Sequence, residues 1–337
     1  MDQDYLLDSY GLIHRVLSSM HPRERVLTFP KYLFTGKGAW RGYERLVTKY
    51  DVDHIYKAID KFKWLLKEYL VPLPSFNRKL FSVPVKYIIK HYMPETWLIK
   101  AKRRYLDPLE DKALRLAMEL SDVSGIPLDS FGVTGSILIG IHNLTLSDIN
   151  LVVYGRKEAE EVRSSLREYL HRRGKLRGLS NNEILTLALN VSKSRAIPLH
   201  YAVKLYEHRW RRGFFEGVPF SVNPVPKVTE LPSLYADVTF YPLVPVTVKV
   251  KVRKDLSLFY PPACEVSNVT FIEGPKIEPL LKVISYEGLY SDIMIEGYEL
   301  LVRGLLQRVK EGSRTYYCVT VGVSEIRGGG YILPLNA

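Results

Sequence analysis

Two short segments near the middle of the chain carry residue types that could hold a phosphate group and a metal ion. The first is the turn Thr134-Gly135-Ser136, and the second is Asp148-Ile149-Asn150, which opens an apolar run. Side chains two positions apart on a strand point to the same face, so Asp148 and Asn150 should project together. Carboxylate and amide oxygens suit a hard cation, and backbone N–H groups at a glycine turn suit phosphate oxygens. The two segments therefore predict a site for a metal-bound phosphate.

The elements around these segments must bring them together. The residues before the turn are β-prone, Ser136 could cap a short helix, and the apolar run that ends at Gly155 is typical of a second strand. After Gly155, Ala159, Val162 and Leu166 recur at helical spacing, so an amphipathic helix should follow. The alternative interpretation is an ordinary αβ unit in which Asp148 caps a turn.

These segments resemble the signature of the DNA polymerase β-type nucleotidyltransferase superfamily, in which a Gly-Ser turn precedes an Asp-x-Asp strand. Much of the chain is also similar to an archaeal group of predicted nucleotidyltransferases. The similar stretches outside the two segments are His21-Pro22-Arg23, Lys31-Tyr32, Val83-Pro84 and Tyr92-Met93-Pro94-Glu95. The resemblance implies an α+β fold with a polymerase β-type core and a Mg²⁺-dependent transfer of a nucleotide from a nucleoside triphosphate. The acceptor would be a nucleic-acid end or a protein hydroxyl.

In that superfamily a third carboxylate comes from a neighbouring strand. The best candidate in this sequence is Asp237, because it lies inside the β-prone run 235–240 instead of a turn. Asp148, Asn150 and Asp237 are then the expected catalytic and metal-binding set, and Thr134, Gly135 and Ser136 the expected nucleotide-binding set. The alternative for Asp237 is an aspartate at a strand edge that faces solvent.

Asn150 departs from the superfamily pattern, which has a second aspartate at this position. An amide oxygen can ligate a hard cation, but it has no charge and cannot bridge two ions as a carboxylate does. The site could therefore be a weakened enzyme. It could equally be a noncatalytic RNA- or DNA-binding protein that kept the fold.

The net charge of +12 and a pI near 9.4 favour an anionic partner such as a nucleic acid. Basic residues cluster beside aromatics at 208–215, and on the run 246–253 they alternate with four valines. If the valines face a core, the bases form one exposed row at intervals of about 7 Å. The expected nucleic-acid-binding residues are Arg209, Arg211, Arg212, Lys249, Lys251 and Arg253. The alternative is that each cluster is only a solvated face.

The organisation along the chain predicts three consecutive regions. An N-terminal α+β region would cover 1–105, the nucleotidyltransferase-like core 106–255, and a small β domain, either a barrel or a sandwich, 256–337. Helices are expected at about 53–69, 85–91, 109–121, 182–191 and 198–210. No apolar run reaches the length of a membrane span, no signal-peptide pattern is present, and the two cysteines lack metal-like spacing. A cytoplasmic protein is therefore expected.

Overall fold

The computed structural model describes residues 1–62, 67–171, 174–231, 238–326 and 329–336. It is a mixed α+β protein with three sheets. Its backbone divides into two compact units that interleave along the chain, whereas the sequence predicted three consecutive regions. The first unit comprises Met1–Thr48, Phe81–Leu179 and Trp210–Pro232. The second unit comprises Lys49–Leu80, Ser180–Arg209 and Ser233–Ala337.

A seven-stranded sheet is built from the N-terminal strands. Its order is β5-β6-β3-β2-β1-β7, and β4 adds to β3. The strands are β1 (Tyr5–Asp8), β2 (Leu12–Val16), β3 (Arg25–Gly38), β4 (Gly42–Arg45), β5 (Leu70–Leu73), β6 (Arg78–Pro84) and β7 (Ile88–Tyr92). The helix expected at 85–91 is wrong. A short 3₁₀ turn leads there into β7, whose β-branched Ile88 and Ile89 favour a strand and whose backbone pairs with β1.

The predicted site segments lie in a five-stranded sheet of the first unit. Its order is β10-β11-β12-β9-β8, with β9 parallel to β12 and antiparallel to β8. The strands are β8 (Phe131–Thr134), β9 (Ile149–Tyr154), β10 (Leu176–Arg177), β11 (Arg212–Phe215) and β12 (Val218–Val225). The helices of this unit are α2 (Pro94–Ala101), α3 (Pro108–Ser124), the single turn α4 (Gly135–Leu138) and α5 (Arg156–Tyr169).

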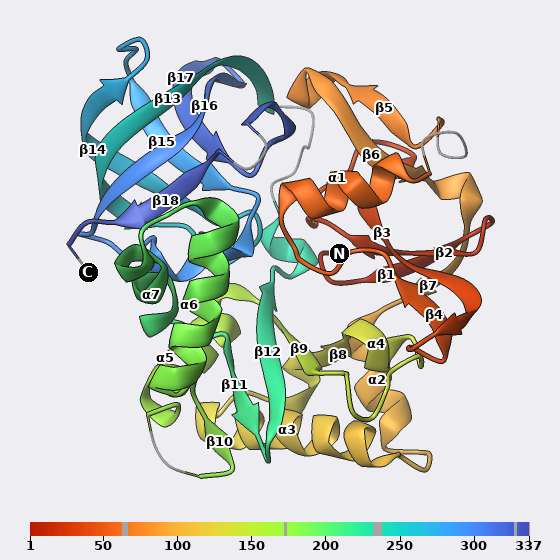
Figure 1. Cartoon of the computed structure of the whole chain (residues 1–337). Coiled ribbons are helices and arrows are strands. Elements are labelled where there is room, and N and C mark those ends of the chain that lie inside the picture. The colour runs from red at the N-terminus through yellow and green to blue at the C-terminus, as the bar shows by residue number, and fades with distance from the viewer. Residues whose placement is uncertain (63–66, 172–173, 232–237, 327–328, 337) are drawn as a thin grey trace. The chain divides into compact units, whose positions relative to one another are not determined.

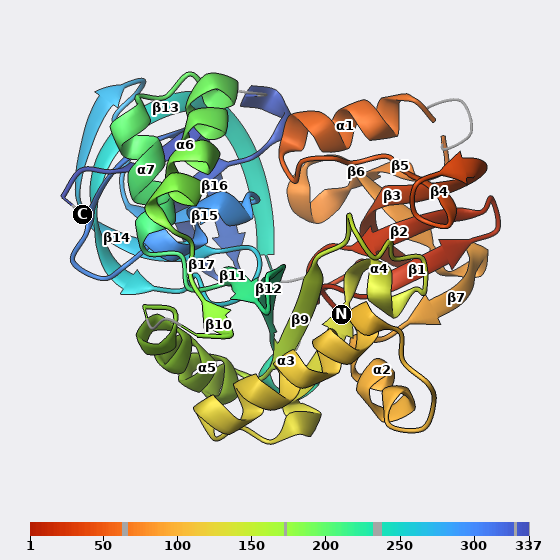
Figure 2. The ribbon, with the colours of Figure 1, turned by 60° about the horizontal axis from the view of Figure 1, so that its bottom comes forward.

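The two faces of this sheet differ. Ile149, Leu151 and Val153 of β9 are fully buried, and α3 and α5 pack on this strand (Figure 2). The opposite face is approached by α2, because a Cβ at Gly132 would lie 2.8 Å from the Pro94 carbonyl carbon. Asn150 and Thr134 lie on that opposite face, and they are partners across β8 and β9. The predicted helix after Gly155 is confirmed as α5.

The second unit contains a closed barrel of five strands (Figure 1). The strands are β13 (Val238–Asp255), β14 (Ala263–Glu273), β15 (Leu280–Ser285), β16 (Glu299–Glu311) and β17 (Arg314–Val321), and β18 (Tyr331–Pro334) adds to β16. The long β13 pairs with both β14 and β16, and β15 runs parallel to β17. This connectivity is that of a five-stranded Greek-key barrel of the OB type. β13, which the sequence assigned to the central core, is thus the first strand of the barrel.

The barrel interior confirms one sequence prediction. Val246, Val248, Val250 and Val252 are all at most 2% exposed, so the alternating valines of β13 face inward. The helices of this unit are α1 (Val52–Asp60), α6 (Asn181–Arg195) and α7 (Leu199–Glu207). They match three predicted helices, although α1 is shorter than expected. No helix among the described residues is long and apolar enough to cross a membrane.

Candidate nucleotide site on the five-stranded sheet

Asp148 and Asn150 lie together on one face of the sheet, as the sequence predicted. Asp148 is exposed just before β9, and Asn150 is half-buried in it. The Asn150 Nδ2 donates a hydrogen bond of 2.8 Å to the Asp148 Oδ1, which is possible only if both side chains point the same way. The same-face prediction is therefore confirmed, although its metal-binding role stays a prediction.

Gly135 brings the turn against this pair. Its φ of +74° lies in the left-handed region that favours glycine, and a Cβ there would lie 3.1 Å from the Asn150 Nδ2. Glycine is therefore required both by the backbone conformation and by the close approach of Asn150. The turn and the Asp-Ile-Asn strand meet as the sequence predicted.

The two hydroxyl groups beside Gly135 make hydrogen bonds within the protein. The Thr134 hydroxyl donates to the Gln3 carbonyl at 2.6 Å, and Ser136 donates to the Ser147 hydroxyl at 3.1 Å. Both residues are buried, and the α4 N-cap is Thr134 instead of Ser136. The expected N-cap role of Ser136 is wrong, because the helix starts at Gly135 and Ser136 is already its second residue. As a result, Gly135 is the residue of this turn that lies against the Asp148–Asn150 pair.

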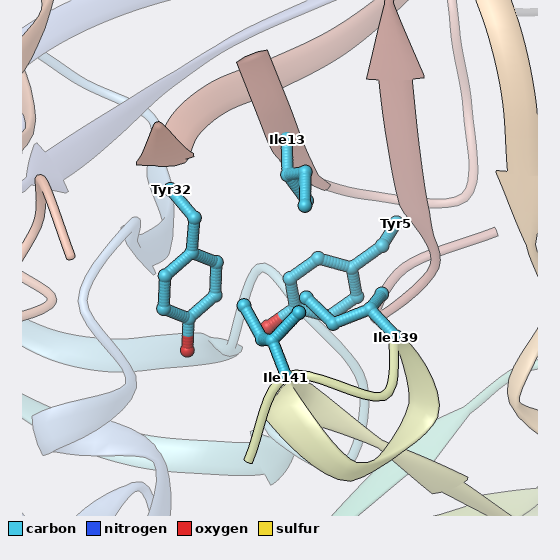
Figure 3. Close-up of a cluster of buried hydrophobic side chains, with 5 residues drawn as sticks. All are labelled: Tyr5, Ile13, Tyr32, Ile139 and Ile141. Carbon is cyan, nitrogen blue, oxygen red and sulfur yellow. The ribbon is translucent and has the colours of Figure 1, made fainter. Parts of the chain in front are cut away.

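An apolar cluster fixes the chain that follows α4. Ile139 and Ile141 pack against Tyr5, Ile13 and Tyr32 from the first three strands (Figure 3). The loop between the turn and Asp148 is thus held from both ends, by this cluster and by the Ser136–Ser147 hydrogen bond. Packing and this hydrogen bond therefore place the turn near Asp148.

The neighbouring strand β12 contributes two polar residues that the sequence analysis missed. Ser221 lies opposite Asn150 in the parallel β9–β12 register and donates to the Asn150 Oδ1 at 2.6 Å. The Asn223 Nδ2 donates to the Leu151 carbonyl at 3.1 Å and to the Ser221 hydroxyl at 3.3 Å. The alternation of polar Ser221 and Asn223 with buried apolar neighbours on a β-prone run was the signal. Because neither residue is acidic, the prediction of a third carboxylate did not include them.

The four side chains form one directed row of donors. Asn223 donates to Ser221, Ser221 donates to Asn150, and Asn150 donates to Asp148. We call Asp148, Asn150, Ser221 and Asn223 the amide row. Its one charge sits at the exposed end, on Asp148. Of the three donors, Asn150 is the one that reaches this carboxylate, and the other two orient Asn150.

A reversed Asn150 amide would keep its contact with Ser221 and give up its hydrogen bond to Asp148. Its orientation follows from the hydrogen-bond pattern, and a half-turn would direct its carbonyl oxygen toward Asp148. Ser221 could then accept from the Asn150 amide nitrogen, because a hydroxyl both donates and accepts. Asp148 and Asn150 would in that state present two oxygens to one cation, which is the ligand type that Mg²⁺ prefers.

Asp237, the expected third ligand, lies outside the described residues. Its convergence with Asp148 and Asn150 stays a prediction. Within the described part of the amide row, Asp148 is the one carboxylate, and neutral Ser221 occupies the position next to Asn150 on the neighbouring strand. The neighbouring strand β12 thus offers a hydroxyl to Asn150 and no charge at that position.

A second polar cluster lies at the start of α3. Asp107, Glu110 and His142 bring one potential ligand atom each within 4.8 Å of one another. Asp107 and Glu110 form a capping box, and the His142 Nε2 lies 2.6 Å from the Asp107 Oδ2. Arg104 donates to both oxygens of Glu110 at 2.8 and 2.7 Å, and one Arg41 nitrogen lies 3.4 Å from Asp107. We call these residues the α3 cap cluster.

The pKa values of the α3 cap cluster reflect these partners. Burial raises the pKa of the Asp107 carboxyl, but hydrogen bonds from the Glu110 backbone and from His142 outweigh it, and the net shift is downward. Burial also raises the pKa of Glu110, and the Arg104 hydrogen bonds reverse that effect. Both acids are therefore held ionised by cations and N–H donors of the protein. A metal ion could bind these acids only by displacing those partners.

The predicted basic row on β13 is present, but two of its cations have partners. Lys251 and Arg253 are exposed and Lys249 is half-buried. The Lys249 Nζ lies 3.0 Å from a Glu299 carboxylate oxygen, and Arg253 pairs with Glu265. Their role in nucleic-acid binding stays a prediction, on a surface whose charge is partly neutralised.

The cluster around 209–212 differs from the expectation. Arg209 is nearly buried, donates to the Gly288 carbonyl at 3.2 Å and lies 3.8 Å from Asp292. Trp210 is only 2% exposed, so the expected exposed aromatic beside Arg211 and Arg212 is not Trp210. Arg212 is exposed, whereas the Arg211 guanidinium lies 4.8 Å from the centre of the Trp210 ring. Trp210 and Phe215 are core residues and Phe214 is half-buried, so the predicted exposed aromatic within 209–212 is wrong.

Both cysteines are buried free thiols, as the sequence predicted. Burial raises the pKa of Cys264 and of Cys318 to about 12 in each case. Because the thiolate is the reactive form, neither thiol is available as a nucleophile at neutral pH. The candidate chemistry therefore belongs to the amide row.

The chain is similar over nearly its whole length to a known protein. The chain is 24% identical over 349 aligned positions to an uncharacterized protein of Methanocaldococcus jannaschii, and the alignment covers 98% of this chain and 97% of that protein. No protein-family model matches the chain. No solved structure matches it. The similarity thus spans the segments of both units.

Proposed function

We propose that the chain is a nucleotidyltransferase of the polymerase β type that binds a nucleoside triphosphate with Mg²⁺ at Asp148. The observation that carries the proposal is the hydrogen-bonded Asp148–Asn150 pair on one sheet face, packed directly against Gly135. A carboxylate and an amide oxygen beside a glycine turn match a phosphate-bound Mg²⁺ ion. The acceptor would be a nucleic-acid end or a protein hydroxyl.

The transfer step should be slow. In-line displacement of pyrophosphate is fastest when two metal ions stabilise the entering and the leaving oxygen. Asp148 alone supplies one negative charge, and neutral Asn150 and Ser221 flank it. One metal would bind the triphosphate well, while the entering oxygen would lack its own ion. Binding without rapid turnover is the expected behaviour.

Binding of triphosphates tests the first half of the proposal. Titration calorimetry should detect Mg²⁺-dependent binding of one or more of the four ribonucleoside triphosphates to the wild-type protein. Asp148→Asn, which keeps the shape and removes the charge, should abolish it. Asp122→Asn removes an exposed carboxylate from α3 and is the matched control. Equal binding by Asp148→Asn and wild type would contradict a site at Asp148.

Rebuilding the acids tests the second half. The double variant Asn150→Asp with Ser221→Asp would place three carboxylates on neighbouring positions, and like-charge repulsion should destabilise it without metal. Mg²⁺ should restore its thermal stability and raise transfer from a labelled triphosphate above the wild-type rate. If Mg²⁺ neither stabilises the double variant nor raises transfer, the nucleotidyltransferase geometry is wrong.

A noncatalytic RNA- or DNA-binding protein with the same fold is the second candidate. The observation that favours it is the neutral character of Asn150 and Ser221, since a chain that has lost catalysis is free to lose these charges. Asn150→Asp alone distinguishes the candidates. A weakened enzyme should bind Mg²⁺ more tightly after this change, and a decayed site should not respond.

A further inference from the structure

A row of cation and tyrosine side chains crosses three strands of the second unit. In the register of the sheet, Tyr241 of β13 lies opposite Arg308 of β16, and Arg308 lies opposite Tyr317 of β17. Residues directly opposite each other in a sheet share a face, with Cβ atoms about 5 Å apart. The Arg308 guanidinium carbon lies 4.6 Å from the centre of the Tyr241 ring. The guanidinium thus lies over one aromatic ring.

The next row on the same face adds a second cation. Lys310 of β16 lies opposite Thr239 of β13 and Thr315 of β17. Arg308, Lys310 and Thr315 are exposed, whereas Tyr241, Tyr317 and Thr239 are half-buried. We call these six residues the tyrosine–arginine face. It combines two cations, two aromatic rings and two small hydroxyls over adjacent strands.

The strand pattern explains why this face is open. Val302 and Leu306 of β16 fill the barrel, and Arg308 and Lys310 continue on the same side of that strand into solvent. The reverse side of the same segments is covered, because Val309 and Tyr316 are buried in an apolar cluster with Phe240. Phe76 stacks on Phe240 at a centroid distance of 5.7 Å. The segment is therefore anchored from behind, which leaves the tyrosine–arginine face free to bind a ligand.

The two cations of this face, both on β16, differ from the cations of β13 in their partners. Lys249 and Arg253 pair with Glu299 and Glu265, whereas no carboxylate among the described residues pairs with Arg308 or Lys310. Cations without acidic partners attract phosphate, and tyrosine rings beside them offer surfaces on which bases stack. A duplex would present its phosphates but hide its base faces, so the matching polymer has unstacked bases.

We propose that the tyrosine–arginine face binds single-stranded nucleic acid, with bases stacked on Tyr241 and Tyr317 and phosphates at Arg308 and Lys310. The site lies entirely within the second unit and uses none of the residues predicted from the sequence. It does not rest on the proposed nucleotide site, although a bound strand would be a fitting partner for a nucleotidyltransferase.

Fluorescence anisotropy on the full-length protein tests this surface. The probes are labelled 12-residue oligouridylate and oligodeoxythymidylate, each titrated at several salt concentrations. Arg308→Gln should weaken binding of the preferred probe about tenfold and reduce the salt slope by about 0.7, the value for one phosphate contact in a single strand. Tyr317→Leu should weaken binding about tenfold with an unchanged salt slope, because stacking releases no counterion.

Lys276→Gln is the matched control, since it removes an exposed cation of the second unit that is paired with Glu278, and it should bind like wild type. Arg308→Lys should retain the salt slope of wild type, and thermal unfolding of every variant reports whether the barrel is intact. Wild-type affinity in Arg308→Gln, or an equal loss in Lys276→Gln, would refute the surface. Wild-type affinity in Tyr317→Leu would refute the stacking. Asp148→Asn should bind the probes normally, so a failed nucleotide site leaves this result untouched.

Discussion

The α3 cap cluster and the amide row both look like cation sites, but they differ in how their charges are compensated. The α3 cap cluster has the richer ligand set, with Asp107, Glu110 and His142 within 4.8 Å. Both oxygens of Glu110 are nevertheless occupied by Arg104, and Asp107 receives N–H donors from the first turn of its own helix. The acids there are already neutralised and stabilise the fold.

The amide row has fewer charges and more freedom. Asp148 receives one hydrogen bond from a neutral amide, and that amide can reverse. A cation would meet one exposed carboxylate and displace no arginine. The comparison teaches that the number of acidic ligands does not define a metal site. A carboxylate is available to a metal ion only if no cationic side chain of the protein already pairs with it.

The largest effect that separates the two clusters should come from Glu110→Ala. The Glu110 side chain is only 9% exposed, and its loss leaves Arg104 and the Asp107 backbone N–H without their acceptor. We expect the free energy of unfolding to fall by about 2–3 kcal/mol in urea denaturation. Asp111→Ala, one residue further along α3 at an exposed site, should cost no more than about 0.5 kcal/mol. Similar losses in both variants would show that the α3 cap cluster is not a stabilising device.

Gly135→Ala should have an intermediate effect and disturb the amide row. The substitution forces a left-handed φ on alanine, which costs about 1–2 kcal/mol, and drives its Cβ against Asn150. Gly140→Ala provides the control, because its φ is +73° but no atom lies within 4 Å of the new Cβ. Both variants should lose stability, and only Gly135→Ala should also weaken Mg²⁺-dependent triphosphate binding. Unchanged triphosphate binding in Gly135→Ala would show that the Gly135 turn is not part of the triphosphate site.

The smallest effect should appear in the pH dependence of stability. The pKa values of Asp107 and Glu110 are lowered in the folded protein, so their contribution is complete above the unfolded pKa values of about 4 and is lost as the pH falls through the folded values. Asp107→Asn should therefore flatten the decline in unfolding free energy below about pH 5. A decline as steep in Asp107→Asn as in wild type would show that this carboxyl does not contribute to it.

Local pattern was sufficient to predict much of the first unit. The alternation around Asp148 and Asn150 predicted the shared face, the Gly135 turn predicted the close approach, and helical spacing predicted α5. In each case the information lies within a few residues, where period and turn chemistry act directly. The valines of β13 were predicted for the same reason.

Non-local pairing accounts for what the sequence did not reveal. Ser221 reaches Asn150 across 71 positions, and no local pattern states which later strand will pair with β9. The ion pairs of Lys249 and Arg253 depend likewise on the registers of β16 and β14. Tyr241, Arg308 and Tyr317 lie far apart in the sequence and become one surface only after three strands align.

The double pairing of β13 has a consequence for how the second unit opens. Thr247, Val248, Lys249 and Lys251 have ladder partners on both sides, in β14 and in β16. Because the amides of a strand bond alternately to its two neighbours, this stretch loses all of its protection only when both β14 and β16 have detached, which opens the barrel. Hydrogen–deuterium exchange should accordingly be slowest there, at the rate of global unfolding, and the centre of β13 should report the stability of the entire barrel.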